Sequence, residues 1–325
     1  MQHSSLVKTW KETSMHPHLG LTIAICTRHR PDDLIHCVSS VAKQKLPANP
    51  IEILVMDDGD LTIAHLIRLS EIIQNTPIEL RYHKKLQPGL FFSRIESLVV
   101  SSYELLLFLD DDVELDADYL TRLVQIYQDD ADISGIGGMD RLIEPAGIAW
   151  SLFGRFFLYS SGVTGKLSAS GYGGSMSGWL ASKQDFVTEF LLGCNMSFRK
   201  SALDKLEVVD WLKSYSLGED IYLSHVARQK GKLIISPQLT VKHNQSAASR
   251  DHEEQVAYTE IVNHYHLLVI KNAKARHYIY QLWTACGLFI RAVLKKSLHF
   301  RVKGYGRAIG FIVNRLIKTT LSERG

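Results

Sequence analysis

The stretch LLLFLDDD at residues 105–112 decides the fold of this chain. Its first five residues have the continuous apolar character of a buried strand, and three aspartates follow directly. Two more short apolar runs have this character, residues 21–27 (LTIAICT) and 51–56 (IEILVM). Strands that alternate with helices predict an α/β fold with a mostly parallel sheet. Helical spacing of apolar residues occurs in the intervening segments 31–45, 61–74 and 89–102.

The composition is that of an ordinary globular protein. Hydrophobic residues make up 46% and charged residues 22% of the 325 residues, which excludes a chain that is disordered, collagen-like or coiled-coil as a whole. The length fits two domains, or one large domain with an extension. The four cysteines form no CxxC pair, so we expect no zinc ribbon or disulfide framework, and a reducing compartment fits best. Residues 1–20 lack an apolar stretch of signal-peptide length, so we expect no secretory leader.

Acidic residues follow two of the predicted strands. Asp57 and Asp58 come after one strand, and Asp110, Asp111 and Asp112 come after another. In α/β sheets, ligands bind at the carboxyl ends of the strands, where loops converge and helix N-termini point inward. An aspartate at a strand end can also simply cap a helix or form a turn. That explanation is weaker for three consecutive carboxylates, because their repulsion is costly unless a cation or hydrogen-bond donors compensate it.

The middle of the chain differs from the strand and helix pattern around it. Residues 140–184 are rich in Gly and Ser and carry aromatic clusters. This composition suits either a mobile loop over a site or an ordinary surface loop. Regular structure is expected again at residues 193–198 (GCNMSF), 218–220 (GED) and 233–236.

Five segments, taken in their order along the chain, resemble those of a known enzyme family. They are ICTRHRPDDL (25–34), EILVMDDGD (52–60), PGLFFSR (88–94), LLFLDDDVEL (106–115) and LGEDIYLSHVARQKGKLIISPQLTVKH (217–243). With these segments the chain is similar to family 2 glycosyltransferases of the GT-A fold, which are inverting, nucleotide-sugar-dependent enzymes. The resemblance implies a GT-A type, Rossmann-like, mostly parallel sheet flanked by helices, with a C-terminal helical extension.

We therefore divide the chain into three parts. An N-terminal extension covers residues 1–20, a GT-A catalytic domain covers residues 21–250, and a basic, amphipathic helical tail covers residues 251–325. Within the catalytic domain, we expect residues 21–115 to form the nucleotide-binding half and residues 140–250 to form the acceptor half.

The resemblance places the nucleotide-sugar donor on the first half of the sheet. Carboxylates can accept a hydrogen bond from the base, and arginines can contact the ring and the phosphates. The residues implied in donor binding are Thr27, Arg28, Arg30, Asp57, Asp58, Arg94, Asp110 and Asp111.

The aspartate triplet resembles the metal-binding signature of the family. Successive residues of an extended segment point to opposite sides, so Asp110 and Asp112 are expected on one side and Asp111 on the other. The resemblance implies Asp112 as a ligand of a divalent cation, with Asp110 and His243 beside it. Mn²⁺ or Mg²⁺ suits such ligands and would neutralise charge on the departing nucleoside diphosphate. Outside this motif order, a lone histidine such as His243 is more often structural.

The GED segment carries the implied catalytic base. Direct displacement at the anomeric carbon needs a carboxylate that takes the proton of the acceptor hydroxyl, and the resemblance assigns this role to Asp220, with Glu219 as its neighbour. The same residues also fit an ordinary helix start, where acidic side chains favour the helix dipole. Cys194 and Asn195 are implied at the floor of the acceptor site. Trp179 is a candidate for stacking on the acceptor, unless it belongs to the core.

Basic residues concentrate in the predicted tail. Residues 271–325 contain 12 Lys and Arg and one acidic residue, whereas residues 1–270 contain 25 Lys and Arg and 33 Asp and Glu. Basic residues interrupt the apolar helical faces, and the longest uncharged run, residues 277–290, is shorter than the ~20 residues that a spanning helix needs. Two explanations stay open: interfacial helices on an anionic membrane surface, which we favour, or a helical extension packed on the catalytic domain.

The leading hypothesis is an inverting, metal-dependent glycosyltransferase that moves a sugar from a nucleotide-diphosphate donor to a hydroxyl of a glycan or lipid-linked acceptor. We expect it in cell-surface polysaccharide or glycolipid biosynthesis, cytoplasmic and peripheral at the inner face of the membrane, with no nucleic-acid partner. One alternative is a nucleotidyltransferase on an α/β fold, although no glycine-rich phosphate loop follows the first strand. The other is a non-enzymatic binder of anionic polymers that uses the basic tail.

Overall fold

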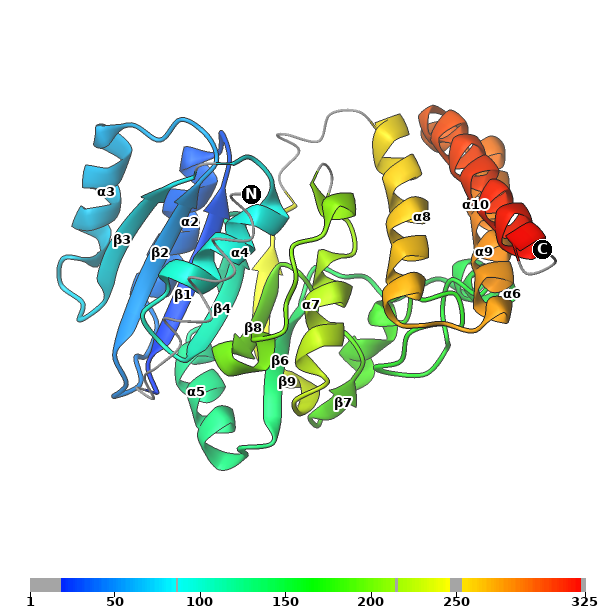
Figure 1. Ribbon diagram of the computed structural model, residues 1–325. Helices are drawn as coiled ribbons and strands as arrows, with labels where there is room; N and C mark the ends of the chain where they lie inside the picture. Colours follow the sequence, from blue (N-terminus) through cyan, green and yellow to red (C-terminus); the bar gives the residue numbers. More distant parts are fainter. Residues whose placement is uncertain (1–18, 86, 214–215, 246–252, 323–325) are drawn as a thin grey trace.

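The computed structural model describes residues 19–85, 87–213, 216–245 and 253–322. Nearly all of the predicted N-terminal extension, residues 1–20, lies outside this range. Figure 1 shows a twisted sheet with helices packed around it, and the long helices of the C-terminal part grouped at one end of the molecule.

The first half of the sheet is parallel. Its elements are β1 (Leu21–Thr27), α2 (Pro31–Ala42), β2 (Ile51–Asp57), α3 (Ile63–Ile73), β3 (Glu79–Lys84), α4 (Leu90–Val100) and β4 (Leu105–Asp110). β1 lies between β2 and β4, and β3 forms the edge. Every residue of β1 and β2 is buried, which explains why apolar residues fill most positions of both strands instead of every second one. The α/β fold predicted from these strands is confirmed.

The second half adds antiparallel strands on the other side of β4. Its elements are β5 (Val113–Leu115), α5 (Tyr119–Asp129), β6 (Ile133–Asp140), β7 (Phe186–Thr188), β8 (Asn195–Arg199), α7 (Glu219–Ala227) and β9 (Lys232–His243). β8 runs antiparallel between β4 and β6, while β9 is parallel to β6 and antiparallel to β5 and β7. The described strands form one sheet in the order β3-β2-β1-β4-β8-β6-β9-β5, with β7 beside β9.

Two strand pairings bring distant segments to the end of β4. Leu109 of β4 pairs with Asn195 of β8, and Val113 of β5 pairs with His243 of β9. The aspartate triplet, which lies between Leu109 and Val113, is therefore enclosed by the start of β8 and the end of β9. This register positions the candidate site.

The Gly/Ser-rich middle segment packs against other parts of the chain. It contains α6 (Ile148–Phe156) and a 3₁₀ helix, η1 (Met176–Ala181). Hydrogen bonds fold the stretch between them, for example from Ser170 Oγ to the carbonyl oxygen of Leu158 at 2.6 Å. The ring of Tyr172 stacks on His264 with the ring centroids 3.7 Å apart. The segment thus forms part of the surface on which the tail packs.

The tail has a hydrophobic core of its own. Its elements are α8 (Glu253–Ile270), α9 (Ala275–Leu294), a 3₁₀ helix η4 (Lys296–Arg301) and α10 (Val302–Ser322). Small and apolar side chains of the three α-helices cluster together with Tyr172. Gln281 Nε2 donates to the carbonyl oxygen of Ile261 at 2.7 Å, and Thr284 Oγ1 donates to that of Phe157 at 2.6 Å. One face of these helices therefore packs on the rest of the protein, as the second explanation for the tail requires.

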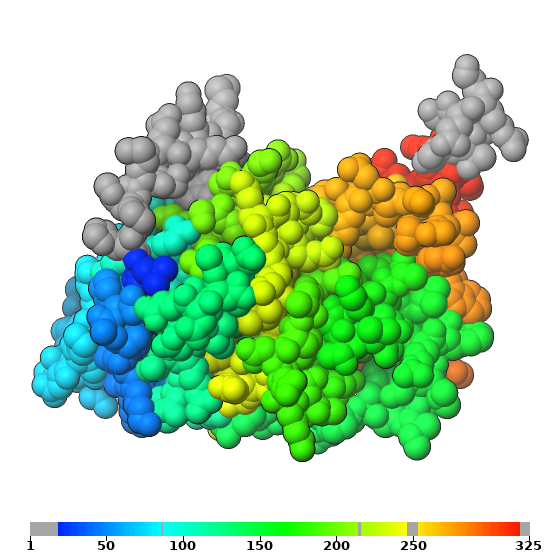
Figure 2. Space-filling view, turned by 90° about the horizontal axis from the view of Figure 1, so that it is seen from below, coloured from blue at the N-terminus to red at the C-terminus, as the bar shows by residue number. Residues whose placement is uncertain are grey.

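The tail lies far from the nucleotide-binding half. Figure 2 shows its helices, in orange and red, at the opposite end of the molecule from the light-blue and cyan residues of α3 and β3. Within the described residues, no helix combines the length and the apolar character required to cross a bilayer.

The contact between α8 and α10 can be tested with two glycine substitutions. A Cβ at Gly304 would overlap the carbonyl oxygen of Glu254 on α8, whereas a Cβ at Gly310 meets nothing within 4 Å. Because alanine is the better helix former, Gly310→Ala should raise the free energy of unfolding by about 0.5–1 kcal/mol. Gly304→Ala should lower it by about 1–3 kcal/mol, since the helices must move apart. Urea denaturation measures both, and equal stability of the two variants would contradict this packing.

Candidate active site

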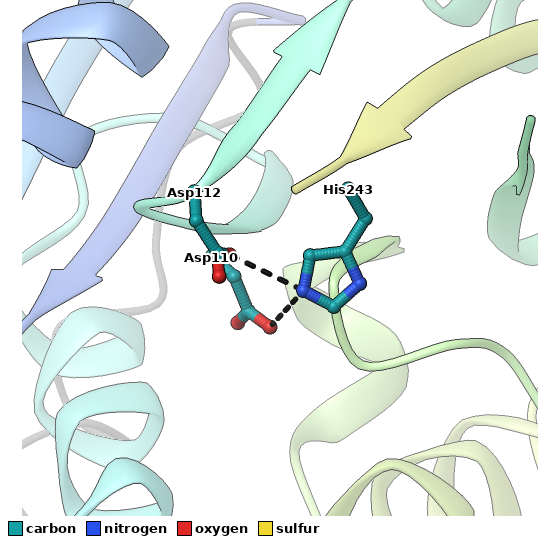
Figure 3. A group of neighbouring side chains, drawn as sticks. All are labelled: Asp110, Asp112 and His243. Carbon is teal, nitrogen blue, oxygen red and sulfur yellow. Dashed lines mark ion pairs between the residues drawn. The ribbon is translucent and has the colours of Figure 1, made fainter. Parts of the chain in front are cut away.

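Two aspartates and a histidine from distant parts of the chain meet beyond the end of β4 (Figure 3). Nε2 of His243 lies 3.2 Å from Oδ1 of Asp112 and 4.0 Å from Oδ2 of Asp110. One potential ligand atom from each residue lies within 4.8 Å of the others. Burial opposes protonation of His243, but the carboxylates of Asp112 and Asp110 outweigh it and raise the histidine pKa.

The donor set of this cluster fits a divalent cation. Two carboxylate oxygens and one imidazole nitrogen are ligands that Mn²⁺ accepts, and Mg²⁺ would use chiefly the oxygens. Burial also raises the pKa of Asp110, because the interior disfavours its charged form. A bound cation would relieve both this cost and the repulsion between Asp110 and Asp112.

Asp111 points away from the cluster and into the protein. Its side chain is fully buried, with Oδ1 2.7 Å from Nη2 of Arg30. Nη1 of Arg30 donates to Oδ2 of Asp112 at 3.2 Å. Burial raises the pKa of Asp111 to about 7, and the charge of Arg30 opposes this shift. Both residues are predicted to contact the donor; in the structure Arg30 pairs with Asp111 and Asp112.

Arg94 connects the aspartate triplet to the GED segment. Its side chain on α4 is only 1% exposed, and Nη1 donates to Oε1 of Glu219. Nη2 lies 3.4 Å from Oδ1 of Asp110 and donates to the carbonyl oxygen of Gly193 at 2.8 Å. Burial acts to lower the pKa of Arg94, but Glu219 and Asp110 raise it overall, so the guanidinium stays charged. Arg94 is predicted to reach the nucleotide; in the structure it pairs with Glu219 and Asp110 and so holds two acidic segments at one site.

Glu219 and Asp220 begin α7, directly after Gly218, whose φ of 88° is left-handed. Glu219 is buried against Arg94, whereas Asp220 keeps partial exposure. Oδ1 of Asp220 accepts the backbone N–H of Ile221 at 2.8 Å. Burial raises the pKa of both carboxyl groups, and the charge of Arg94 opposes both shifts. Asp220 is therefore the member of the pair that can reach a bound molecule.

The tail helix α8 supports the segment that carries Asp220. Asn263 of α8 is buried, and its Nδ2 donates to the carbonyl oxygen of Leu217 at 2.8 Å. Leu267 packs over Gly218, where an added Cβ would lie 3.1 Å from its Cδ1. Sequence reasoning missed Asn263, because no motif marks this residue.

Asp140 is a second residue that sequence reasoning missed. It is the last residue of β6, and its Oδ1 accepts the backbone N–H of His243 at 3.2 Å. Its Oδ2 lies 3.9 Å from Nδ1 of the same histidine. An aspartate at the end of a strand was the available signal, but the glycines of β6 (ISGIGGMD) hid the strand.

The predicted donor-binding residues at the ends of β1 and β2 differ in their accessibility. Asp57 is buried and accepts hydrogen bonds from Lys84 Nζ and Tyr82 Oη, both at 2.9 Å. Burial favours its neutral form, yet these donors hold the pKa of Asp57 below its usual value. Of the others, Arg28 is exposed, Asp58 is partly exposed and Thr27 is buried.

The three predicted acceptor residues are largely buried. Trp179 is 2% exposed and packs on Phe190 with ring centroids 5.2 Å apart, so it belongs to the core rather than to an open acceptor surface. Asn195 is fully buried, and its side-chain amide has no hydrogen-bond partner among the described residues. The carbonyl oxygen of Cys194 accepts the N–H of Asp110 at 3.2 Å. Burial raises the pKa of the Cys194 thiol well above its usual value, which makes it a poor nucleophile.

Solved structures of glycosyltransferases resemble this fold. The structure of S. aureus TarS 1–349 in complex with UDP-GlcNAc matches with a TM-score of 0.54 and 13% identity, over 91% of this chain and 81% of that chain. GalNAc-T7 with UDP, GalNAc and Mn²⁺ matches with a TM-score of 0.47 and 17% identity, over 69% and 43%. A longer S. aureus TarS structure matches with a TM-score of 0.47 and 13% identity, over 83% of this chain and 43% of that chain, so the chain spans less than half of its length. The first match shows a shared fold, the GT-A fold.

The family of the chain follows from its sequence. A search of curated proteins finds no match. The family model for glycosyl transferase family 2, however, matches residues 22–206, more than half of the chain. This match favours a glycosyltransferase over both the nucleotidyltransferase and the non-enzymatic binder. The chain thus belongs to glycosyl transferase family 2 and is a glycosyltransferase.

Proposed function

We propose that this glycosyltransferase is inverting and metal-dependent, and transfers a sugar from a nucleotide-diphosphate donor to an acceptor hydroxyl. The observation that carries the proposal is the bridge made by Arg94, which joins Glu219, next to Asp220, to Asp110 of the metal-binding candidates. Inversion requires a base on the face of the sugar opposite the leaving group. A carboxylate that is near the cation cluster but separate from it meets this requirement.

Asp220 is the proposed base. Its carboxylate takes the proton of the acceptor hydroxyl while the hydroxyl oxygen forms a bond to the anomeric carbon. The bond from that carbon to the phosphate oxygen breaks, and the nucleoside diphosphate leaves with the electron pair. The raised pKa of Asp220 makes it a stronger proton acceptor than an exposed aspartate. Glu219, paired with Arg94, is the proposed neighbour that positions it.

Asp112, Asp110 and His243 are proposed to hold Mn²⁺ or Mg²⁺. A divalent ion there supplies Lewis-acid stabilisation of the negative charge on the departing diphosphate. Asp140 supports His243 by accepting its backbone N–H at 3.2 Å, and its other carboxylate oxygen lies 3.9 Å from Nδ1 of the ring.

We assign the donor to residues 21–115 and the acceptor to residues 140–250. Thr27, Arg28, Asp57 and Asp58 are proposed to surround the nucleotide, and the buried Cys194 and Asn195 to support the acceptor site from below. Because TarS 1–349 was solved with UDP-GlcNAc, this is the first donor to test. A glycan or lipid-linked acceptor in cell-surface polysaccharide or glycolipid synthesis, with the enzyme peripheral at the inner face of the membrane, fits the positive charge of the tail.

The role of Asp220 predicts a loss of transfer without a loss of donor binding. Asp220→Asn should lower the rate of UDP release from UDP-GlcNAc by at least ~10²-fold, because the amide cannot take the acceptor proton. The Kd for the donor with Mn²⁺, measured by calorimetry, should change little. Asp210→Asn is a matched control, because Asp210 is close to Asp220 in the sequence but its side chain is 86% exposed. Parallel losses of binding and turnover would exclude Asp220 as the base.

The role of Asp112 predicts weaker metal activation. Asp112→Ala should raise the Mn²⁺ concentration for half-maximal UDP release by at least ~10-fold, because the cluster loses a ligand. Glu114→Ala is the control: Glu114 is two residues away but pairs with Lys242 at 3.1 Å rather than with the cluster. The same Mn²⁺ titration for Asp112→Ala as for the control would rule Asp112 out as a ligand.

The charge of Arg94 predicts a pH effect with a definite sign. Burial raises the pKa of Asp220 and Arg94 lowers it, so turnover should fall as the pH drops through a pKa above the ordinary aspartate value. Arg94→Gln removes the cation, makes Asp220 harder to ionise, and should move this acidic limb to higher pH. Arg94→Lys keeps the charge and should move it less. An acidic limb that stays in place, or moves to lower pH, in the glutamine variant would contradict the assignment.

A further inference from the structure

Helix α6 presents an apolar stripe to solvent. Ile148, Leu152 and Phe156 are four residues apart and lie on one face of the helix. All three are exposed, Ile148 to 82%. The stripe therefore faces solvent, and α6 lies outside the basic tail, in the middle segment of the chain.

Helix α9 is apolar on two opposite faces. Ala285, Leu288 and Ala292 are buried in the core of the tail. The opposite face carries exposed large side chains instead, with Leu294 79% exposed. Apolar helix faces are normally buried, yet the outer face of α9 stays largely exposed in the part of the chain that the structure describes. The exposed residues of that face are Ile279, Trp283, Ile290, Val293 and Leu294.

The stripes of α6 and α9 join into one surface. Nε1 of Trp283 donates to the carbonyl oxygen of Phe156 at 2.8 Å, and the two rings are 5.4 Å apart. Arg291 of α9 lies over the ring of Trp150 of α6, 4.1 Å from its centroid. Figure 1 shows α6 beside α9 at the end of the molecule. We call the combined patch the α6–α9 surface: Ile148, Leu152, Phe156, Trp283, Ile290 and Leu294.

The charged side chains of helices α6 and α9 are all basic. Residues 145–183, which include α6, and residues 261–322, which include α9 and α10, contain no Asp or Glu. Basic residues stand on the same two helices and directly after α9: Arg155, Arg276, Arg291, Lys295 and Lys296. Apolar side chains with a tryptophan and a basic border match the boundary between the acyl chains and the anionic headgroups of a bilayer.

We propose that the α6–α9 surface docks on an anionic phospholipid bilayer, with its apolar side chains in the headgroup region and its basic residues at the phosphates. This surface would bring the glycosyltransferase proposed above to a membrane-bound acceptor. Only this benefit of docking depends on the proposed function. It differs from binding by the tail alone, because half of the surface belongs to α6 and the inner face of the tail is used in packing. A bilayer fits better than an acidic protein, because the surface combines large exposed apolar side chains, Trp283 among them, with basic residues beside them.

The test is co-sedimentation of the full chain with vesicles of phosphatidylglycerol and phosphatidylcholine. The double variant Ile148→Asp, Leu152→Asp should lose at least about tenfold in vesicle affinity. Two apolar side chains that enter the bilayer are then replaced by negative charges that the anionic surface repels. Ile63→Asp on α3 is the matched control, with a side chain that is 77% exposed at the other end of the molecule. The Ile63→Asp variant should bind vesicles like the unmodified protein. Both variants should have the melting temperature of the unmodified protein.

Two results would overturn the proposal. One is vesicle binding by the double variant as strong as that of the control. The other is a dimer of the unmodified protein in the absence of vesicles that does not form with the double variant, which would assign the surface to a second copy of the chain.

The rate of UDP release without vesicles separates this inference from the proposed function. The double variant should release UDP at the rate of the unmodified protein. If the unmodified protein sediments with vesicles but releases no UDP from any nucleotide-sugar, the proposed function fails while the docking surface stands.

Discussion

The buried guanidinium of Arg94 is the contact on which the rest of the site depends. It comes from α4 in the first half of the fold and reaches Glu219, Gly193 and Asp110, so one side chain connects the start of α7, the segment before β8 and the end of β4. A buried charge is tolerated only with good partners, and losing one partner of such a pair typically costs ~3–5 kcal/mol. These ion pairs therefore hold the start of α7, which carries Asp220, beside the end of β4.

The sheet topology explains how that contact arises. β8 inserts antiparallel beside β4, and β9 returns His243 to the same edge, so the triplet is enclosed by chain from the second half. α8 then holds the loop before α7 through Asn263. The tail thus has two sides: its inner side is part of the support for the proposed base, while its outer side remains apolar and borders α6.

Much of the fold was predictable because buried parallel strands are continuously apolar, as in β1, β2 and β4. β6 was missed because its glycines lower its apolar content; they are needed where β9 approaches, since a Cβ at Gly138 would overlap the carbonyl oxygen of Leu239. Side chains alternate in direction along the extended triplet, so the sequence predicts that Asp111 points away from Asp110 and Asp112. No sequence pattern shows that Arg30 pairs with Asp111. The packing of the tail was also undecidable from sequence, because amphipathic helices bury an apolar face equally well in lipid or in protein.

The central claim is that Asp110, Asp112 and His243 hold a cation while Asp220 faces the sugar from the other side. The most direct measurement is the anomalous scattering of Mn²⁺ in crystals grown with a nucleotide-sugar. We predict a Mn²⁺ peak bound by Asp112 and His243, with the anomeric carbon of the donor between the ion and Asp220. A peak elsewhere, or a donor whose anomeric carbon is remote from Asp220, would contradict the claim.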